Sequence, residues 1–354
     1  MTKHSTGVKV YAMKKLITII TIIIICMALL PSCSADDSSN GQSGGAGSRK
    51  SGELKIVTTI FPEYDWTRNI IGDNGDKVNA TITLMAKKGM DMHSYQPSAK
   101  DLVTISECDV FIYVGGESDK WVSEALGQAA NKDMQVIDLM DILGDNARTE
   151  ELKEGMQKAR GEHEEENEDH EGSEGEEEEP EYDEHVWLSL KNAQIFTNSI
   201  ADALKKADPK NSDLYSANAA AYIKKLKSLD QKYAKVTNGA KTKTLLFADR
   251  FPFRYLTEDY GLDYYAAFAG CSSESAASFE TMTFLANKAD ALAIKNILTI
   301  DGSDKKIAES VIAITKDEDK KILTMDSMQT RTDGSYLDIM QKNLKVLDKA
   351  LNNI

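Results

Sequence analysis

The chain has 354 residues, of which 41% are hydrophobic and 28% charged, a composition that argues against a wholly disordered polypeptide. Its formal charge of −15 argues against a nucleic-acid partner, because phosphate binding needs an excess of lysine and arginine. Four cysteines without a C-x-x-C pair exclude a disulfide-dense scaffold and a zinc knuckle, so the fold must come from packing.

The first fifty residues have the pattern of an export signal followed by a linker. Lys14 and Lys15 precede an apolar run of 15 residues that leads to Leu-Pro-Ser-Cys at Cys33. Because a membrane-spanning helix needs about 20 residues, residues 1–32 are predicted to be a signal peptide. The segment is similar to bacterial lipoprotein signals, which implies that Cys33 carries the lipid. Residues 33–51, rich in serine and glycine, then form a flexible tether to the outer side of the cytoplasmic membrane.

Residues 52–189 are predicted to form an N-terminal α/β lobe, because short apolar runs alternate with amphipathic segments. The expected strands are 53–60, 78–85, 109–114 and 134–139, and the expected helices are 63–71, 98–108 and 121–130. This alternation favours a parallel sheet covered by helices.

The acidity is concentrated at residues 161–184. From Glu162 to Glu184 the chain holds 15 Asp or Glu, no Lys or Arg, and two of its five histidines, His163 and His170. Repulsion between like charges and the lack of apolar side chains predict a disordered loop. We interpret it as a weak collector of divalent cations, and the alternative is a solubilising insertion.

Two helices are expected after this tract, over 190–207 and 211–236, within a connecting segment 190–238. The second would be about 39 Å long at about 1.5 Å per residue, enough to run along two lobes. Strand and helix patterns then resume in a C-terminal α/β lobe, 239–354, with expected strands 244–248, 264–268, 296–300 and 321–325 and expected helices 253–260, 279–289, 305–314 and 336–351. The predicted fold class is therefore α/β, with two lobes that each contain a mainly parallel sheet flanked by helices and are joined by one long helix. A ligand would lie between the lobes, at the carboxyl ends of the strands.

Four histidines remain after the signal peptide, and two have distinctive surroundings. His93 lies in G-M-D-M-H-S-Y-Q-P after a strand, and His185 lies in Y-D-E-H-V-W-L-S at the start of a helix. These stretches resemble the zinc and manganese substrate-binding proteins of bacterial ABC importers, in which each carries one metal-ligating histidine. The resemblance extends over about 54–351. It implies that His93 and His185 are ligands and that Asp326, in L-T-M-D-S-M, is a carboxylate ligand from the C-terminal lobe.

The resemblance breaks at the remaining ligand, a His or Glu that the family carries about ten residues before an aromatic-Gly pair. Counting back from Tyr260 and Gly261 gives Arg250, whose guanidinium cannot bind a cation. Asp249 is our candidate instead, and Arg250 is expected to fix a ligating carboxylate. The alternative is a cleft ion pair between Asp249 and Arg250, with water as the fourth ligand. The reserve candidates are Glu274, Glu280 and Asp301.

Two imidazoles and two carboxylates balance a divalent charge and suit tetrahedral Zn²⁺, with Mn²⁺ as the alternative metal. The resemblance implies a receptor without catalytic activity that delivers the metal to an ABC transporter membrane permease. The long helix would stiffen the hinge, so a small cleft movement is expected. A secreted zinc-dependent hydrolase is the rival interpretation, although the sequence contains no H-E-x-x-H or G-x-S-x-G motif. Cys108 and Cys271 are expected to be independent buried thiols, and a disulfide between them is left open.

Overall fold

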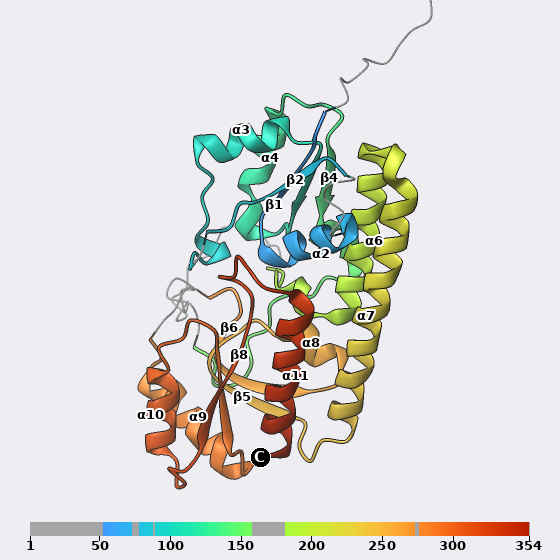
Figure 1. Ribbon diagram of the computed structural model, residues 1–354. Helices are drawn as coiled ribbons and strands as arrows, with labels where there is room; N and C mark the ends of the chain where they lie inside the picture. The colour runs from blue at the N-terminus through green and yellow to red at the C-terminus, as the bar shows by residue number, and fades with distance from the viewer. Residues whose placement is uncertain (1–51, 73–77, 88, 158–180, 273–275, 354) are drawn as a thin grey trace, which may run out of the picture. The chain divides into compact units, whose positions relative to one another are not determined.

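The computed structural model describes residues 52–72, 78–87, 89–157, 181–272 and 276–353, which contain two four-stranded parallel sheets (Figure 1). The signal peptide, the tether with Cys33, and His163 and His170 lie outside these residues. Within the described part of the chain, no helix combines the length and apolarity needed to cross a membrane.

The first sheet has the strand order β2-β1-β3-β4, and its neighbouring strands are parallel. Alternate residues face opposite sides, so Ile56 and Val110 enter one apolar cluster while Val57 and Phe111 enter another. The strands are β1 (Leu54–Thr58), β2 (Ala80–Leu84), β3 (Val110–Tyr113) and β4 (Gln135–Asp138), and the helices are α2 (Phe61–Ile71), α3 (Ala99–Glu107), α4 (Trp121–Gly127) and α5 (Leu139–Leu143). Helix α5 was not expected from the sequence.

The second sheet has the strand order β6-β5-β7-β8 and is also parallel. Leu246 and Ala248 face a cluster that includes Leu285 and Val311, whereas Phe247 faces the other side. The strands are β5 (Thr244–Phe251), β6 (Asp263–Ala269), β7 (Asn296–Ile300) and β8 (Lys321–Met325), and the helices are α8 (Arg254–Asp259), α9 (Phe279–Ala291), α10 (Lys306–Ile314) and α11 (Tyr336–Asn352).

Helices α6 (Leu190–Ala207) and α7 (Ser212–Asn238) connect the two lobes, and α7 packs against α2 of the first and α11 of the second (Figure 1). The Tyr222 hydroxyl donates to Asp65 Oδ2 at 3.5 Å, and the Tyr233 hydroxyl donates to the Met340 carbonyl at 2.6 Å. The prediction of two parallel-sheet lobes joined by one long helix is confirmed.

One continuous apolar cluster contains residues of both sheets and of the connecting helices. Tyr336, at the start of α11, is fully buried within it. Its backbone N–H donates to Asp65 Oδ2 at 3.0 Å, and its hydroxyl donates to the Trp187 carbonyl at 2.6 Å. The Trp187 indole in turn donates to the Ser327 carbonyl at 2.8 Å. Because separating the lobes would expose this shared core to water, the packing opposes a wide opening.

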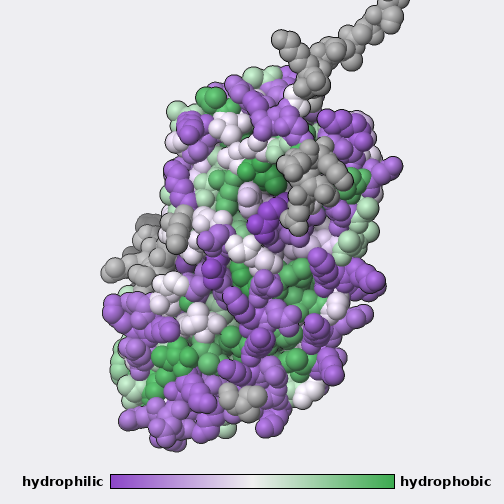
Figure 2. Space-filling view, in the orientation of Figure 1, coloured by the Kyte–Doolittle hydropathy of each residue, from purple (hydrophilic) through white to green (hydrophobic). Residues whose placement is uncertain are grey.

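The face of the molecule shown in Figure 2 is mostly hydrophilic, with apolar residues in small patches.

The last residues of the acidic tract, from Glu181, belong to the described structure. Tyr182 forms an antiparallel bridge with Thr149, and Asp183 and Glu184 are buried. The carboxylates of Asp183 and Glu184 accept hydrogen bonds inside the protein, although the disordered loop was predicted to run to residue 184.

Strand β5 extends three residues beyond the predicted end at Ala248. Its pairing with β6 shifts register between Phe247 and Arg250. Asp249 and Arg250 therefore lie within an irregular part of the strand rather than after it, and their side-chain directions could not be read from simple alternation.

The turn after β3 is held by a buried carboxylate. Asp119, 8% exposed, accepts hydrogen bonds from the backbone N–H groups of Val114 and Gly115 at 3.0 and 3.1 Å. Burial raises the pKa of Asp119 to about 7, with a further contribution from Glu184, against the lowering effect of the two backbone donors.

This raised pKa predicts that the contribution of Asp119 to the free energy of unfolding falls as pH rises. The folded protein holds the proton more tightly than the unfolded chain, so the contribution is fully present below pH 4 and is lost as pH rises to about 7. In urea unfolding of the metal-free protein, the free energy of unfolding should fall between pH 5 and pH 8, and this fall should be about 2 kcal/mol smaller in Asp119→Asn than in wild type. The exposed control Glu318→Gln should leave that fall unchanged. Equal pH dependence in Asp119→Asn and wild type would contradict the prediction.

Candidate metal centre

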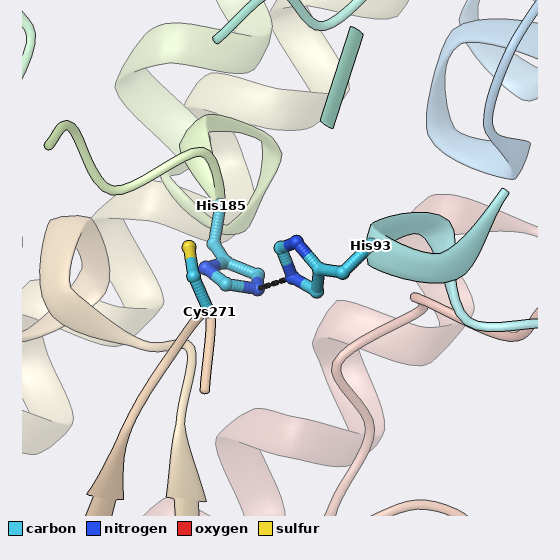
Figure 3. A group of neighbouring side chains, drawn as sticks. All are labelled: His93, His185 and Cys271. Atoms are coloured by element: carbon cyan, nitrogen blue, oxygen red, sulfur yellow. Dashed lines mark hydrogen bonds between the residues drawn. The ribbon is translucent and has the colours of Figure 1, made fainter. Parts of the chain in front are cut away.

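Two histidines from distant parts of the chain meet at the boundary between the lobes. His93 lies in the short helix η1 (Met92–Ser94), and His185 directly precedes the short helix η4 (Val186–Leu188). Their Nε2 atoms are 3.2 Å apart although 92 positions separate them in sequence (Figure 3). His185 is fully buried, and the His93 side chain is 15% exposed.

Each imidazole is oriented by a carboxylate on its Nδ1 side. Asp183 Oδ1 accepts from His185 Nδ1 at 2.9 Å and from the His185 backbone N–H at 2.8 Å. Glu184 Oε2 lies 3.2 Å from His93 Nδ1, and the Ser118 hydroxyl lies 2.9 Å from the same nitrogen. A proton on each Nδ1 satisfies these carboxylates and leaves a lone pair on each Nε2. The two lone pairs then face the same small space.

Glu184 is itself held in place. Its Oε1 accepts from the Ser118 backbone N–H at 2.7 Å. Burial opposes its ionisation, but hydrogen bonds from His93 and Ser118 outweigh this and lower the pKa of Glu184. A Cβ atom on Gly116 would lie 2.5 Å from Glu184 Oε1, and Gly116 has a φ of +79°, so this turn requires glycine. The result is a fixed anion behind His93.

Gln329 closes the pair of histidines from the C-terminal lobe. Its amide Nε2 lies 2.7 Å from His185 Nε2 and 3.1 Å from His93 Nε2, so the amide donates to the imidazole lone pairs. Its Oε1 lies 3.1 Å from the Ser327 hydroxyl, which is also 2.8 Å from Asp301 Oδ1. The single Ser327 proton can go to Asp301. A half-turn of the Gln329 amide would then bond its NH₂ to Ser327 and turn Oε1 toward the histidines.

Cys271 is the third potential ligand at this point. Among the described residues, ligand atoms of His93, His185 and Cys271 lie within 4.8 Å of one another (Figure 3). A Cβ on Gly270 would lie 3.0 Å from the His185 ring and 2.9 Å from the Phe251 carbonyl, so glycine allows this close approach. Burial, with the nearby charges of Asp183 and Glu150, raises the pKa of the Cys271 thiol.

Both described cysteines are free thiols. Cys108 is buried in the apolar cluster on one face of the first sheet, and neither histidine belongs to that cluster. Cys271 is partly exposed. Sequence reasoning treated Cys271 as a packing residue. The signal that would have marked it is its position two residues after the end of β6, at the carboxyl edge of the second sheet.

The two predicted aspartate ligands have other partners. Asp326 Oδ2 accepts from Arg331 Nε at 2.9 Å, and Asp326 Oδ1 accepts from the Met328 backbone N–H at 3.0 Å. Asp249 accepts from its neighbour's backbone N–H at 2.9 Å and from the Ile300 N–H at 3.3 Å. Neither belongs to the group around the histidines. Their roles as ligands stay predictions, and the site proposed below does not use them.

Arg250 crosses the cleft to the segment that carries His93. Its Nη2 donates to Asp91 Oδ2 at 2.8 Å, and Asp91 Oδ1 accepts from the His93 backbone N–H at 3.1 Å. The guanidinium lowers the pKa of Asp91 against the effect of burial. Arg250 thus fixes a carboxylate that positions a histidine, rather than the expected ligating carboxylate or a side-chain pair with Asp249.

A cleft of about 760 Å³ leads from solvent to His93. Residues of both lobes line it, including Asp91, Arg250 and Asp304. Of the reserve candidates, Asp301 also lines the cleft, Glu280 is exposed at the start of α9, and Glu274 lies outside the described residues. The polar lining provides a path for a hydrated cation.

Comparisons of the sequence and of the structure with known proteins point to the same family. The ZnuA protein of Bacillus subtilis, named a high-affinity zinc uptake system protein, is 29% identical over 336 residues that cover 93% of this chain and 96% of the relative. The zinc-binding lipoprotein AdcA of Streptococcus pneumoniae R6 is 29% identical over 302 residues, 84% of this chain. The chain spans 56% of the length of this and the other AdcA relatives it matches.

The solved structures agree with the two-lobe fold. The Zn(II)-bound ZnuA-like domain of S. pneumoniae AdcA is 27% identical, covers 85% of this chain and 100% of its own, and has a TM-score of 0.64. The metal-dependent lipoprotein YcdH of B. subtilis, 23% identical with a TM-score of 0.65, covers 84% of this chain and 99% of its own, and shares the fold. Residues 56–350 match the family described as zinc-uptake complex component A, periplasmic, and the chain belongs to this family, ZnuA.

Proposed function

We propose that the protein is an extracytoplasmic receptor that captures Zn²⁺ between its lobes and delivers it to the membrane permease of an ABC importer. The observation that carries this proposal is the 3.2 Å separation of the His93 and His185 Nε2 atoms. Two nitrogen ligands at about 2.0–2.1 Å from a tetrahedral zinc are about 3.3 Å apart. The imidazoles therefore already stand at the spacing that a shared zinc ion requires.

The surroundings of the two nitrogens favour zinc over manganese. The imidazoles and their carboxylate partners form the carboxylate–histidine pairs that tune zinc ligands. Manganese prefers more oxygen ligands and lies below zinc in the general order of affinity. The relatives named as zinc-binding or zinc-uptake proteins support the same metal.

The site suits binding better than hydrolysis. A hydrolytic zinc needs an open position for water and a general base beside it. Asp183 and Glu184 are occupied as acceptors for the histidine Nδ1 atoms, and Gln329 lies against both Nε2 atoms. The protein thus holds the metal without an assembled catalytic group, as a receptor does.

The location and partner follow from the N-terminal sequence together with the family. This part of the proposal is supported by the signal-like residues 1–32, the lipid-anchor candidate Cys33 and the polar tether, which together would hold the folded part at the outer side of the membrane, within reach of a permease. The B. subtilis relative is named as part of a zinc uptake system. Membrane fractionation of wild type and Cys33→Ser tests the anchor.

Removing either imidazole should greatly weaken zinc binding. His93→Ala and His185→Ala should each lower zinc affinity more than about 100-fold, because loss of a supporting residue alone costs about 10–100-fold. Chelator-competition calorimetry on metal-free protein measures the effect. The same measurement with Mn²⁺ tests metal preference.

The matched control is His163→Ala, which removes an imidazole from the acidic tract and should leave the high-affinity site intact. Circular dichroism establishes that each variant is folded. Unchanged zinc affinity in both His93→Ala and His185→Ala would refute the receptor site.

The acidic tract should contribute only weak binding. Deletion of 161–180 should change the high-affinity zinc constant less than about threefold while reducing the number of weakly bound ions, because isolated carboxylates and imidazoles at a surface bind divalent cations weakly. The deletion stops before Glu181 because Asp183 and Glu184 orient the histidines. If the tract alone were the receptor, this deletion would abolish high-affinity binding.

A further inference from the structure

We propose that Cys271 supplies a thiolate ligand to the metal held by His93 and His185, which makes the cargo a thiophilic divalent cation. This inference rests on the proposed function and adds a ligand that the family resemblance did not indicate. It is carried by the convergence of two ring nitrogens and one sulfur from three separate segments within 4.8 Å.

The Cys271 sulfur could reach bonding distance of a shared metal after a small movement of its side chain. Zinc with a sulfur ligand at about 2.3 Å and a nitrogen ligand at about 2.0–2.1 Å requires a sulfur–nitrogen distance of about 3.5 Å. Ligand atoms of the three residues lie within 4.8 Å of one another, so about 1.3 Å of approach at most brings the sulfur to that distance from a ring nitrogen. In Figure 3 the sulfur lies on the Nδ1 side of His185, so the Cys271 side chain must also rotate toward the Nε2 atoms to share their metal. Gly270, whose missing side chain brings this segment onto the His185 ring, makes the approach possible.

The second sheet explains why a cysteine would serve here. Arg250 cannot ligate, and its guanidinium is held by Asp91. Strand β6 pairs directly with β5, and Phe251 is in register with Ala269. Cys271, two residues beyond the end of β6 at Ala269, thus lies next to the end of β5 at the same edge of the sheet. The neighbouring strand supplies the donor that the Arg250 position lacks.

Binding exchanges a proton for the metal. The Cys271 S–H bond breaks, the sulfur lone pair forms the sulfur–metal bond, and the proton passes to solvent, with no change in oxidation state. Two imidazoles and one thiolate leave a fourth position, which the Gln329 amide oxygen can fill after its half-turn. A nitrogen and sulfur set of this kind favours Zn²⁺, Co²⁺ or Cd²⁺ and disfavours Mn²⁺.

Cobalt provides the direct test. Metal-free full-length protein titrated with Co²⁺ should develop a thiolate-to-cobalt charge-transfer band in the near ultraviolet at one equivalent. Cys271→Ser should lose the band, while Cys108→Ser, the matched control for the other body cysteine, should keep it. Cys271→Ser should also reduce the ratio of zinc to manganese affinity at least tenfold.

The outcomes separate this inference from the receptor proposal. Tight cobalt and zinc binding by wild type without the band, or a band that persists in Cys271→Ser, would overturn the thiolate ligand while the histidine site stood. Loss of zinc binding in the histidine variants concerns the receptor alone. Because the wild-type spectrum needs no substitution, misfolding of Cys271→Ser cannot hide the answer, and Cys271→Ala gives a second variant.

Discussion

Two imidazole Nε2 atoms held 3.2 Å apart are the constraint on which the rest of the site depends. With the ring protons on Nδ1, both Nε2 atoms are acceptors. Two acceptors at this distance repel unless a donor or a cation lies between them. Asp183 and Glu184 enforce the arrangement by accepting from the opposite ring nitrogens. Gln329 supplies the donor in the structure described, and a metal ion would replace it. The site is therefore prepared for a cation before the cation arrives.

The geometry of the site depends on the apolar core that the two lobes share. His93 and His185 belong to the first lobe, whereas Gln329 and Cys271 belong to the second, so their distances depend on how the lobes pack. Apolar residues of both lobes and of the connecting helices form one cluster, and Tyr336 and Trp187 hydrogen-bond within it. A preorganised site avoids part of the entropy cost of binding. Such packing is consistent with the expected small cleft movement.

The sequence predicted the two lobes and pointed to the two histidines that the structure brings together. The patterns over 190–207, 296–300 and 321–325 match the observed elements because buried faces and turn residues determine them locally. His93 and His185 stood out because imidazoles are rare in this chain and lie beside strand or helix ends.

The remaining candidate ligands depend on interactions that sequence patterns do not encode. Asp326 pairs with Arg331 only five residues away, and the register shift in β5 changes where Asp249 points. Gln329 carries no chemical signal for metal binding in sequence, since amides are common surface residues. Cys271 becomes a candidate only when β6 is placed beside β5. Partner choice and strand pairing are tertiary properties.

Gln329 also bears on how a tightly held cation leaves. Departure of the metal would expose the two histidine lone pairs to each other, which raises the free energy of the empty site. The Gln329 amide offsets this by donating to both nitrogens, while Ser327 and Asp301 accommodate the change in its orientation. An internal donor of this kind stabilises the metal-free site and so opposes metal binding. For the receptor that we propose, this opposition favours release of the cation to the permease.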